Sequence, residues 1–468
     1  MIDDLKPYPA VKETGIPGLE HIPEHWKLRR LKTLFREVDD RTGTGTETLL
    51  SLRQQHGLVD HHALGGKPIA PEALIGFKRA QPGQIVMNRM RAAAGLFAVA
   101  PQVGIVSPDY AVLSPITSLV PAYFIHLFKT PAMMALFRTE SRGLGTGQSG
   151  FLRLYTERFG MLSVPYPPAD EQAAIVGFVE HAERRIRRYL RAKQKLVTLL
   201  NEQKQAIIQR AVTRGINPNV RLKSSGIEWL GDLPEHWTLK RFKFLAKISS
   251  GQIDPRDGRY RDRILIAPNH VESGTGIIQF QESADAQGAD SGKYLVRRGQ
   301  IVYSKIRPNL RKAIIAPFDC LCSADMYPIT VDQAEILPEY CLLLMLSAPF
   351  TKYAVDCSLR VAMPKVNREA LGECWFWYPD LAEQQTILHF LTATLRPTDV
   401  AIAATQHEIK LLHEHRTRLI ADVATGKLDV RDAVEALPDL TRSEYTDQFD
   451  GTTDFDENAD EPETEEAA

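Results

Sequence analysis

The sequence predicts an α+β protein that contains one mixed α/β domain twice, with a long helix after each copy. An internal repeat and two helical segments of similar length support this fold class. Residues 12–35, KETGIPGLEHIPEHWKLRRLKTLF, return at 223–246 as KSSGIEWLGDLPEHWTLKRFKFLA, at a constant offset of 211 residues. Because half of the chain repeats the other half, we expect two related domains and not one large catalytic domain.

The repeat extends beyond this block. PGQIVMNRMR at 82–91 resembles RGQIVYSKIR at 298–307. PPADEQAAIVGFV at 167–179 resembles PDLAEQQTILHFL at 379–391. Small insertions explain why the offset varies between 211 and 216 residues. We therefore divide the chain into a first globular domain, a first long helix with its linker, a second globular domain, a second long helix and an acidic tail, at 1–168, 169–222, 223–380, 381–436 and 437–468.

The segment from Phe178 to Arg214 contains neither Gly nor Pro and predicts one long helix. Asp170 is its expected N-cap, and Gly215 is expected to end it. At 1.5 Å per residue, this segment gives a helix of about 55 Å. Its apolar residues recur in steps of four and three, the pattern of a coiled-coil seam: Ile175, Val179, Ala182, Ile186, Tyr189, Leu196, Leu200 and Ile207.

The corresponding segment of the second half begins with LAEQQTILHFL, is interrupted by Pro397 and ends at Gly426. Its apolar stripe consists of Ile402, Ile409, Leu412, Leu419 and Val423. Neither helix can bury its stripe alone, so we expect the two to pair as an antiparallel coiled coil with the two domains related by a pseudo-twofold axis. Lys193 and Gln203 are polar seam positions that weaken this pairing and leave room for a partner protein.

Charge is distributed unevenly along the chain. Residues 439–468 hold twelve Asp or Glu and one base, Arg442, so the rest of the chain has 56 basic and 46 acidic residues, a net charge of +10. We expect this last segment to be a disordered tail, which either aids solubility or shields a basic surface. Seven Arg and Lys also crowd into 184–195, where a solvated helix face and a surface for phosphates or an acidic partner are equally supported.

The sequence favours a cytoplasmic location. It has no run of 18 or more uncharged apolar residues, and its N-terminus lacks the basic and apolar regions of a signal peptide, so no membrane is expected as a partner. All five cysteines lie in the second half without counterparts in the first. A shared metal site or disulfide framework is therefore not expected.

Signals of catalysis are absent. The chain has no GxxxxGK[ST] phosphate loop, no HExxH zinc helix, no GxSxG elbow and no NPPF-like or DPPY-like tetrapeptide of amino-methyltransferases. Residues 145–150 match GxGxxG, but neither a hydrophobic strand nor a helix flanks them, so we interpret them as a flexible loop. Trp26 and Trp237, each preceded by His, are expected to anchor the start of each domain in its core.

Several of these motifs resemble those of the specificity subunits of type I restriction-modification systems. They are GIEWLGDLPEHW at 226–237, the PPADEQ and LAEQQ stretches that begin the long helices, AVTRGI at 211–216 and ATGKLDVRDAV at 424–434. The resemblance covers the chain except for its acidic tail. It is specific, because a domain-start motif, a variable region and an EQ helix follow one another in that order, twice.

The resemblance implies a protein without catalysis of its own. The two globular domains would be target-recognition domains that each bind one half of a bipartite site in double-stranded DNA. The paired helices would dock two methyltransferase subunits and, for cleavage, two ATP-driven endonuclease subunits that translocate DNA. No cofactor is then expected on this chain, because partner subunits would bind S-adenosylmethionine and ATP with Mg. The expected subunit-interface residues are Ile186, Leu196, Leu200, Ile207, Ile409, Leu412 and Leu419.

Two divergent domains on a rigid spacer suit recognition of two short sequences at a fixed separation. At 3.4 Å per base pair, a spacer of about 55 Å would separate half-sites by at most about 16 base pairs, and about one helical turn is favoured. The variable stretches at 49–66 and 253–276 differ, so the half-sites should differ too.

Base recognition in the major groove uses Arg or Lys for guanine and Asn or Gln for adenine, with hydroxyls as adaptable partners. In the first domain, these residue types cluster at Arg53, Gln54, Gln55, Asn88, Arg89, Arg91, Gln148 and Ser149. In the second domain, they cluster at Asn269, His270, Lys305, Arg307, Asn309, Arg311, Lys312, Lys365 and Asn367. GTGQSGFL at 145–152 and AMPKVN at 362–367 resemble the segment of the family's recognition domains that faces DNA. We predict that these groups supply the DNA contacts.

Two other classes of protein stay open. One is a self-contained DNA methyltransferase or nuclease with degenerate motifs, which would turn over a methyl donor without partners. The other is a structural coiled-coil assembly factor, against which the basic body and the large variable domains argue.

The combined substitution Lys305→Ala and Arg307→Ala is expected to weaken specific DNA binding, because it removes two cations from one cluster. Association with the methyltransferase should stay intact. Gel-shift titration at fixed salt measures the first effect, and unchanged affinity would contradict the prediction.

Overall fold

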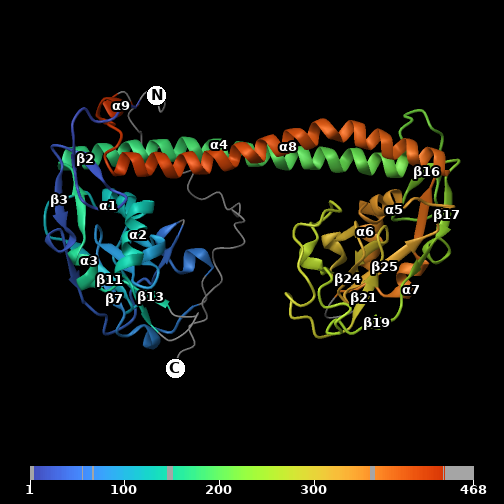
Figure 1. Ribbon diagram of the computed structural model, residues 1–468, viewed down its shortest axis with the longest axis horizontal. Helices are drawn as coiled ribbons and strands as arrows, with labels where there is room; N and C mark the ends of the chain where they lie inside the picture. Colours follow the sequence, from blue (N-terminus) through green and yellow to red (C-terminus); the bar gives the residue numbers. More distant parts are fainter. Residues whose placement is uncertain are drawn as a thin grey trace. The chain divides into compact units, whose positions relative to one another are not determined.

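The computed structural model describes residues 5–54, 56–65, 68–144, 151–358, 364–435 and 437 (Figure 1). The chain forms two compact units: unit 1 comprises Met1–Leu190 and Lys410–Ala468, and unit 2 comprises Arg191–Ile409. Two long helices, α4 (Ala169–Arg214) and α8 (Leu381–Ala424), each contribute one part to each unit. Each unit combines helices with small sheets, which confirms the predicted α+β class.

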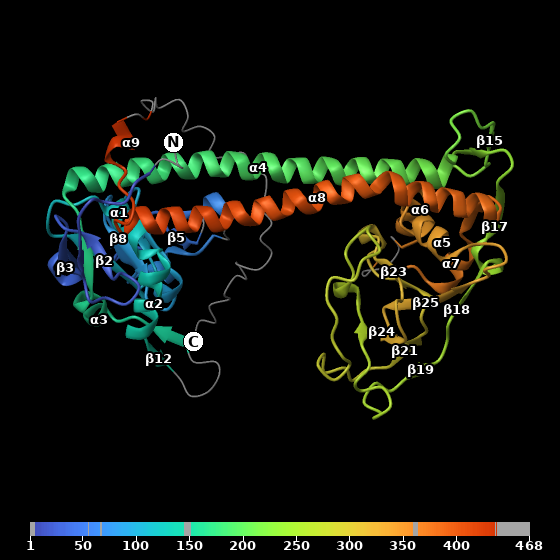
Figure 2. The ribbon, with the colours of Figure 1, turned by 45° about the horizontal axis from the view of Figure 1, so that its top comes forward.

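Within each unit, α4 and α8 lie side by side and run in opposite directions (Figures 1 and 2). In unit 1, the Arg416 guanidinium of α8 bonds to the Glu183 carboxylate of α4 at 2.7 Å. In unit 2, the Lys204 ammonium of α4 bonds to the Asp399 carboxylate of α8 at 2.5 Å. The residue of α8 that makes the contact has a lower number where the residue of α4 has a higher one. The helices therefore run in opposite directions, and the predicted antiparallel pairing is confirmed.

The seam of α4 departs from the predicted pattern after Ile186. Leu190 is buried, whereas Tyr189 and Leu196 are 54% and 41% exposed. The buried positions Ala182, Ile186 and Leu190 therefore follow two consecutive steps of four. An α-helix has 3.6 residues per turn, so a strict 3.5-residue pattern drifts away from its partner, and an additional step of four corrects the drift. The assignment of Tyr189 and Leu196 to the seam is wrong for this reason.

The polar seam position Lys193 forms an ion pair with Glu408 of α8 at 2.5 Å, whereas Gln203 is exposed. Glu408 of α8 thus neutralises the charge of Lys193, which was expected to weaken the pairing of the helices. Among the other positions expected at a subunit interface, Ile186 and Leu419 are buried, and Leu200, Ile207, Ile409 and Leu412 are half-buried. Their contact with a partner subunit stays a prediction.

The ends of the long helices differ in detail from the prediction. α4 begins at Ala169, and the backbone N–H of Gln172 donates to the Pro168 carbonyl at 2.9 Å, so Asp170 lies inside the first turn and is not the N-cap. Gly215 ends α4 with a φ of 73°. α8 continues through Pro397, contrary to the predicted interruption. A proline removes one N–H donor, and the buried face of α8 on both sides of Pro397 keeps the helix together.

A Glu-Gln pair in the first turn of each long helix fastens it to its globular part. In unit 1, Glu171 bonds to the His25 imidazole at 2.8 Å, and in unit 2 Glu383 bonds to the His236 imidazole at 2.7 Å. Trp26 and Trp237, next to these histidines, are 0% and 2% exposed, which confirms their predicted anchoring role. The repeated PEHW and EQ motifs are therefore two sides of one contact.

The glutamine of each pair is fully buried and satisfies backbone groups. Gln172 accepts from the Val120 N–H at 2.9 Å and donates to the Pro167 carbonyl at 2.8 Å. Gln384 accepts from the Leu337 N–H and donates to the carbonyls of Pro379 and Glu335, all at 2.9 Å. The N–H groups belong to the residues just before α1 (Pro121–Phe128) and α5 (Pro338–Met345), so each glutamine also positions the next helix.

The same sheet occurs in both units. Unit 1 has a four-stranded antiparallel sheet in the order β4-β11-β8-β9, and unit 2 has one in the order β18-β25-β22-β23. The strands of unit 1 are β4 (Phe35–Val38), β11 (Tyr110–Pro115), β8 (Ile85–Asn88) and β9 (Phe97–Val99). Those of unit 2 are β18 (Ala246–Ile248), β25 (Met326–Val331), β22 (Ile301–Ser304) and β23 (Ala313–Ile315). The sequence repeat is thus a repeat of topology.

Other elements also correspond between the units. Two-stranded pairs are β1 (Val11–Glu13) with β2 (His21–Pro23), β3 (Lys27–Arg30) with β14 (Ser163–Tyr166), β15 (Leu222–Ser224) with β16 (Asp232–Pro234), and β17 (Thr238–Arg241) with β26 (Trp375–Tyr378). The remaining helices are α2 (Pro131–Glu140), α3 (Thr156–Met161), α6 (Ala348–Ser358), α7 (Arg368–Glu373) and α9 (Arg431–Glu435).

The units differ in their other strands, some of which lie in the stretches 49–66 and 253–276 that the sequence marked as variable. Unit 1 has the pairs β5 (Leu50–Arg53) with β6 (Gly57–Asp60), β7 (Lys78–Ala80) with β10 (Gly104–Val106), and β12 (Arg142–Leu144) with β13 (Phe151–Arg153). Unit 2 has a second sheet in the order β19-β21-β24-β20, made of β19 (Gln252–Ile253), β21 (Lys293–Val296), β24 (Cys320–Cys322) and β20 (Leu265–Ile266). Within the described ranges, no helix is both long and apolar enough to cross a membrane.

Replacing Gln384 by Ala should lower the free energy of unfolding by about 3 kcal/mol, because three backbone groups lose a buried partner. The neighbouring Gln385 is exposed, so Gln385→Ala is the matched control and should change it by less than about 0.5 kcal/mol. Differential scanning calorimetry measures both, and equal shifts for the two variants would contradict the fastening role.

Ile186→Ala should lower the free energy of unfolding by about 2–4 kcal/mol, because the side chain is only 4% exposed. Tyr189→Ala, three residues along the same helix, should change it by less than about 0.5 kcal/mol. Urea unfolding followed by circular dichroism compares the two variants. A larger loss of unfolding free energy from Tyr189→Ala would show that Tyr189 does lie in the seam.

Candidate nucleic-acid interface

In each unit, the loop after β8 or β22 lies against the segment that leads into α3 or α7. The Arg89 carbonyl accepts from the Leu154 N–H at 2.9 Å, and the Lys305 carbonyl accepts from the Val366 N–H at 2.8 Å. The two contacts are equivalent in the repeat. Residues 88–96 with 151–156 form what we call loop surface 1, and residues 304–312 with 364–368 form loop surface 2. Most of the residues predicted to contact DNA lie on them.

Two predicted DNA contacts of loop surface 1 are structural residues instead. Asn88 is 8% exposed, and its side-chain oxygen accepts from the N–H groups of Met90 at 3.0 Å and Arg91 at 3.2 Å. The Arg89 side chain is 15% exposed and bonds to the Glu37 carboxylate. Both side chains hold the loop in shape and are not available to a base.

Glu37 also bonds to the buried Lys78 ammonium at 3.0 Å. Burial raises the pKa of Glu37, but hydrogen bonds from Thr156 and Lys78 and the charge of Arg89 outweigh it, so the pKa lies below its ordinary value. The carboxylate therefore stays ionised at neutral pH and keeps Arg89 in place.

Arg91 and Gln54 are the exposed members of the predicted set in unit 1. The Gln54 amide donates to the Ala94 carbonyl at 3.1 Å, which brings the end of β5 to the loop after β8. Arg53 is half-buried at the end of β5. Gln55, Gln148 and Ser149, together with the glycines of 145–150, lie outside the described residues.

Sequence reasoning missed two arginines of the hairpin β12–β13. Arg142 is exposed and lies directly opposite Arg153, whose guanidinium bonds to Asp109 at 3.2 Å and lies 5.6 Å from the Tyr155 ring centroid. Two like charges at one cross-strand position repel each other, so the pair favours a nearby anion. The repeat could have identified Arg153, because an offset of 212 residues relates it to Lys365.

One predicted contact of unit 2, His270, is structural, and another, Asn367, also caps a helix. His270 is 1% exposed, packs on Phe280 at 4.5 Å between ring centroids, and accepts from the Ala267 N–H at 3.3 Å. Burial lowers its pKa, so the ring is neutral. The Asn367 side chain accepts from the Ala370 N–H at 2.7 Å and is the N-cap of α7. The prediction of His270 as a base contact is corrected accordingly, whereas Asn367 is exposed and its contact with a base stays a prediction.

The lysines of loop surface 2 are partly engaged with the backbone. Lys305 donates to the Ala324 carbonyl at 2.6 Å, and Lys312 donates to the Pro268 carbonyl at 2.7 Å. The predicted residues that are exposed are Asn269, Arg307, Asn309, Lys365 and Asn367, while Arg311 is half-buried. These six residues are the predicted polar groups that loop surface 2 and its neighbour loop offer to a ligand.

The basic run on α4 is largely exposed. Arg184 and Lys193 are half-buried, whereas Arg185, Arg187, Arg188, Arg191 and Lys195 are exposed. Arg187 lies 3.4 Å from Glu183 on the same helix. This side of α4 is positively charged and accessible.

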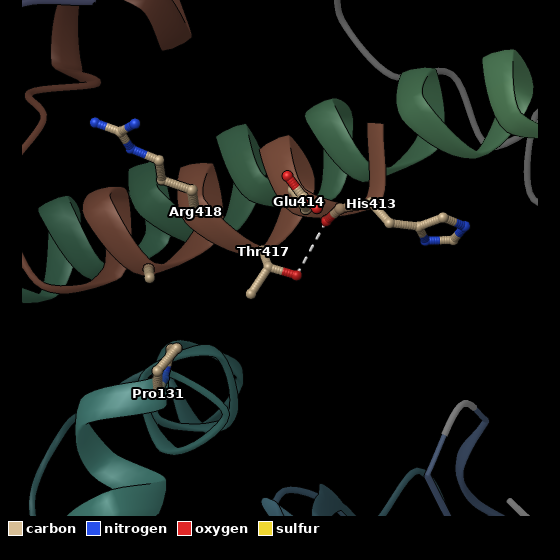
Figure 3. A pocket seen from close by; sticks show the side chains of 6 residues that line it. Pro131, His413, Glu414, Thr417 and Arg418 are labelled. Carbon is tan, nitrogen blue, oxygen red and sulfur yellow. Dashed lines mark hydrogen bonds between the residues drawn. The ribbon is translucent and has the colours of Figure 1, made fainter. Parts of the chain in front are cut away.

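A separate open pocket in unit 1 lies between the start of α2 and α8 (Figure 3). Its labelled polar side chains do not converge, since His413 and Arg418 point in opposite directions, and the Thr417 hydroxyl donates to the His413 carbonyl at 3.1 Å. Small-molecule sites need convergent polar groups, so this pocket is not a candidate site. Within the described ranges, no three or more His, Cys, Asp or Glu gather where they could hold a metal ion.

Comparisons with known proteins agree with this arrangement. The family described as type I restriction modification DNA specificity domain matches residues 234–411. The specificity subunit of the type I restriction enzyme EcoDI from Escherichia coli is 34% identical over 215 residues. That match covers 46% of this chain and 47% of the relative, so the chain spans about half the length of the curated relative.

Two solved structures are also similar. A chain from a structure on complex assembly and conformational transition of the type I restriction-modification system has a TM-score of 0.64 at 14% identity, over 87% of this chain and 99% of that one. The HsdS subunit from Thermoanaerobacter tengcongensis has a TM-score of 0.46 at 14% identity, over 87% of this chain and 98% of that one. The first likeness shows a shared fold. The resemblance to specificity subunits of type I restriction-modification systems is confirmed by the match of residues 234–411 to the type I restriction modification DNA specificity domain and by the 34% identity to the EcoDI subunit.

Proposed function

We propose that this chain is the DNA sequence-specificity subunit of a type I restriction-modification complex. Each unit binds one half of a bipartite, asymmetric site in double-stranded DNA. The chain has no catalytic role. Two methyltransferase subunits, which bind S-adenosylmethionine, and two endonuclease subunits, which use ATP with Mg, carry out the chemistry.

One observation carries the proposal: the two units share a sheet and an equivalent pair of loops, yet the loops present different side chains. Loop surface 1 offers Arg91 and, on its hairpin, Arg153. Loop surface 2 offers Arg307, Asn309 and Lys365. A common scaffold with different exposed polar groups suits recognition of two different base sequences.

The division between side chains that fix the loops and side chains that are exposed also supports a role in DNA recognition. Arg89, Asn88 and Asn367 fix the loops through bonds within the unit, so the exposed side chains start from a preformed backbone. Preformed contacts lose less conformational freedom on binding. Exposed arginines and lysines bind phosphates regardless of sequence, and those that reach base edges add about 1–3 kcal/mol of discrimination each.

The helices α4 and α8 supply the spacing in this proposal, because each continuous helix begins in one unit and ends in the other. Their exposed apolar residues Tyr189, Leu196, Leu199 and Leu411 lie outside the seam and suit contact with methyltransferase subunits. A purely structural assembly factor would need the same helices but not two sets of exposed base-matching side chains.

Single-molecule sequencing of methylated positions in genomic DNA tests the proposal. Cells that carry the gene should show methylation at one two-part motif with a fixed gap, and cells without it should lack that methylation. The two halves of the motif should differ in sequence. Identical methylation in both strains, or a motif without a gap, would contradict the proposal, and methyl transfer by the isolated chain would favour a self-contained enzyme.

A further inference from the structure

The turn at the tip of loop surface 2 has an unusual backbone. Among the described residues, only two that are not glycine have a positive φ, Arg307 and Arg311, both at 48°. They flank the short 3₁₀ helix Pro308–Leu310. A side chain disfavours this left-handed conformation, because Cβ approaches the carbonyl oxygen. Such strain persists where the surroundings enforce it, and it is concentrated at functional sites.

Hydrogen bonds from three other parts of unit 2 enforce the turn. The Arg307 N–H donates to the Pro364 carbonyl, and the Gly274 N–H donates to the Arg311 carbonyl, both at 3.0 Å. The Lys312 ammonium donates to the Pro268 carbonyl at 2.7 Å. The turn is thus held at both ends before any ligand arrives.

The equivalent turn of unit 1 shows that the fold itself does not require a side chain at the strained position. Residues 91–95 correspond to residues 307–311 at the offset of 216. Gly95 occupies the place of Arg311 and has a φ of 76°, a conformation that is not strained for glycine. Ala92–Ala94 occupy the place of Pro308–Leu310. Unit 2 therefore has an arginine where glycine would be more stable, which indicates a use for that side chain.

The two arginines of the turn differ in their surroundings. Arg307 is exposed, and the ion pairs within the described part of unit 2 include neither arginine. The Arg311 guanidinium lies against Gly274, so closely that a Cβ there would come within 3.2 Å of Nη2. Arg311 therefore packs the turn against the 272–276 loop, while Arg307 projects its guanidinium freely.

We propose that Arg307 recognises a guanine in the half-site bound by unit 2, and that Arg311 is a positioning residue that aims it. This inference rests on the proposed function and deepens it. A free guanidinium on a preformed turn can donate two parallel hydrogen bonds to O6 and N7 of guanine, the pattern that distinguishes this base in the major groove. Unit 1 lacks the second arginine, so its turn presents Arg91 alone.

The methylated motif of cells carrying Arg307→Ala tests the proposal first. We expect the guanine requirement to relax at one position of one half of the motif, with the other half unchanged. Arg298→Ala is the matched control, because it removes an exposed arginine of the same unit that lies outside loop surface 2 and outside the variable stretch 253–276. It should leave the motif intact.

A binding assay with 7-deazaguanine, which lacks the N7 acceptor, then tests the contact itself. The complex purified from the host should bind the substituted duplex roughly 5- to 150-fold more weakly than the natural one. The Arg307→Ala complex should bind both duplexes equally, and the Arg298→Ala complex should behave as the natural one. Equal sensitivity of the natural and Arg307→Ala complexes overturns the inference.

Arg311→Gly introduces the residue of unit 1 and separates positioning from folding. Relief of the strained backbone should raise the Tm by about 2–4 °C, while discrimination for guanine falls. Unchanged discrimination would remove the positioning role from Arg311. If the natural chain yields no two-part motif at all, the proposed function fails, whereas a motif that keeps its guanine in Arg307→Ala contradicts only this inference.

Discussion

The structure depends on one repeated contact, the bond between the first turn of each long helix and the start of the globular part that precedes it in sequence. Glu171 and Glu383 engage the histidines of the PEHW motifs, and the buried Gln172 and Gln384 satisfy backbone groups at the start of the next helix. A buried amide that leaves several backbone groups unpaired when removed is costly to lose. This cost explains why the PEHW motif and the Glu-Gln pair occur in both halves of a chain whose sequence otherwise diverges.

Within this fixed frame, the loops of each unit separate two tasks. Asn88, Arg89 and Asn367 use their polar groups to hold the backbone, and Arg91, Arg307 and Lys365 keep theirs exposed. In unit 1, hydrogen bonds from Thr156 and Lys78 and the charge of Arg89 keep Glu37 ionised despite its burial, and this carboxylate fixes Arg89. Residues of the same type, only a few positions apart, thus either hold the loop backbone or remain exposed to a ligand.

This proximity explains which site residues the sequence could not assign. An Asn at an N-cap and an Asn that contacts adenine look alike in a sequence, because both use the same amide. Asn88, Arg89 and His270 were expected at DNA but are engaged within their units. Nearby N–H groups of Met90 and Arg91 bond to Asn88, the distant Glu37 bonds to Arg89, and Phe280 packs on His270. Tyr189 and Leu196 were misplaced for a geometric reason, because small periodic drifts accumulate along a long helix.

The sequence by itself determined the duplication, the α+β class, the two long helices and their antiparallel pairing, since repeats and apolar periodicity are local patterns that few folds can satisfy. It also predicted the loops that we propose bind DNA and, through the motifs, the resemblance to specificity subunits of type I restriction-modification systems. Only the tertiary structure decided which polar side chains bond to other groups of the fold and where the helix seam shifts. It also decided that α8 continues through Pro397. Several of those outcomes depend on contacts between residues far apart in sequence, such as Arg89 with Glu37 and Lys193 with Glu408, whose energies no local pattern contains.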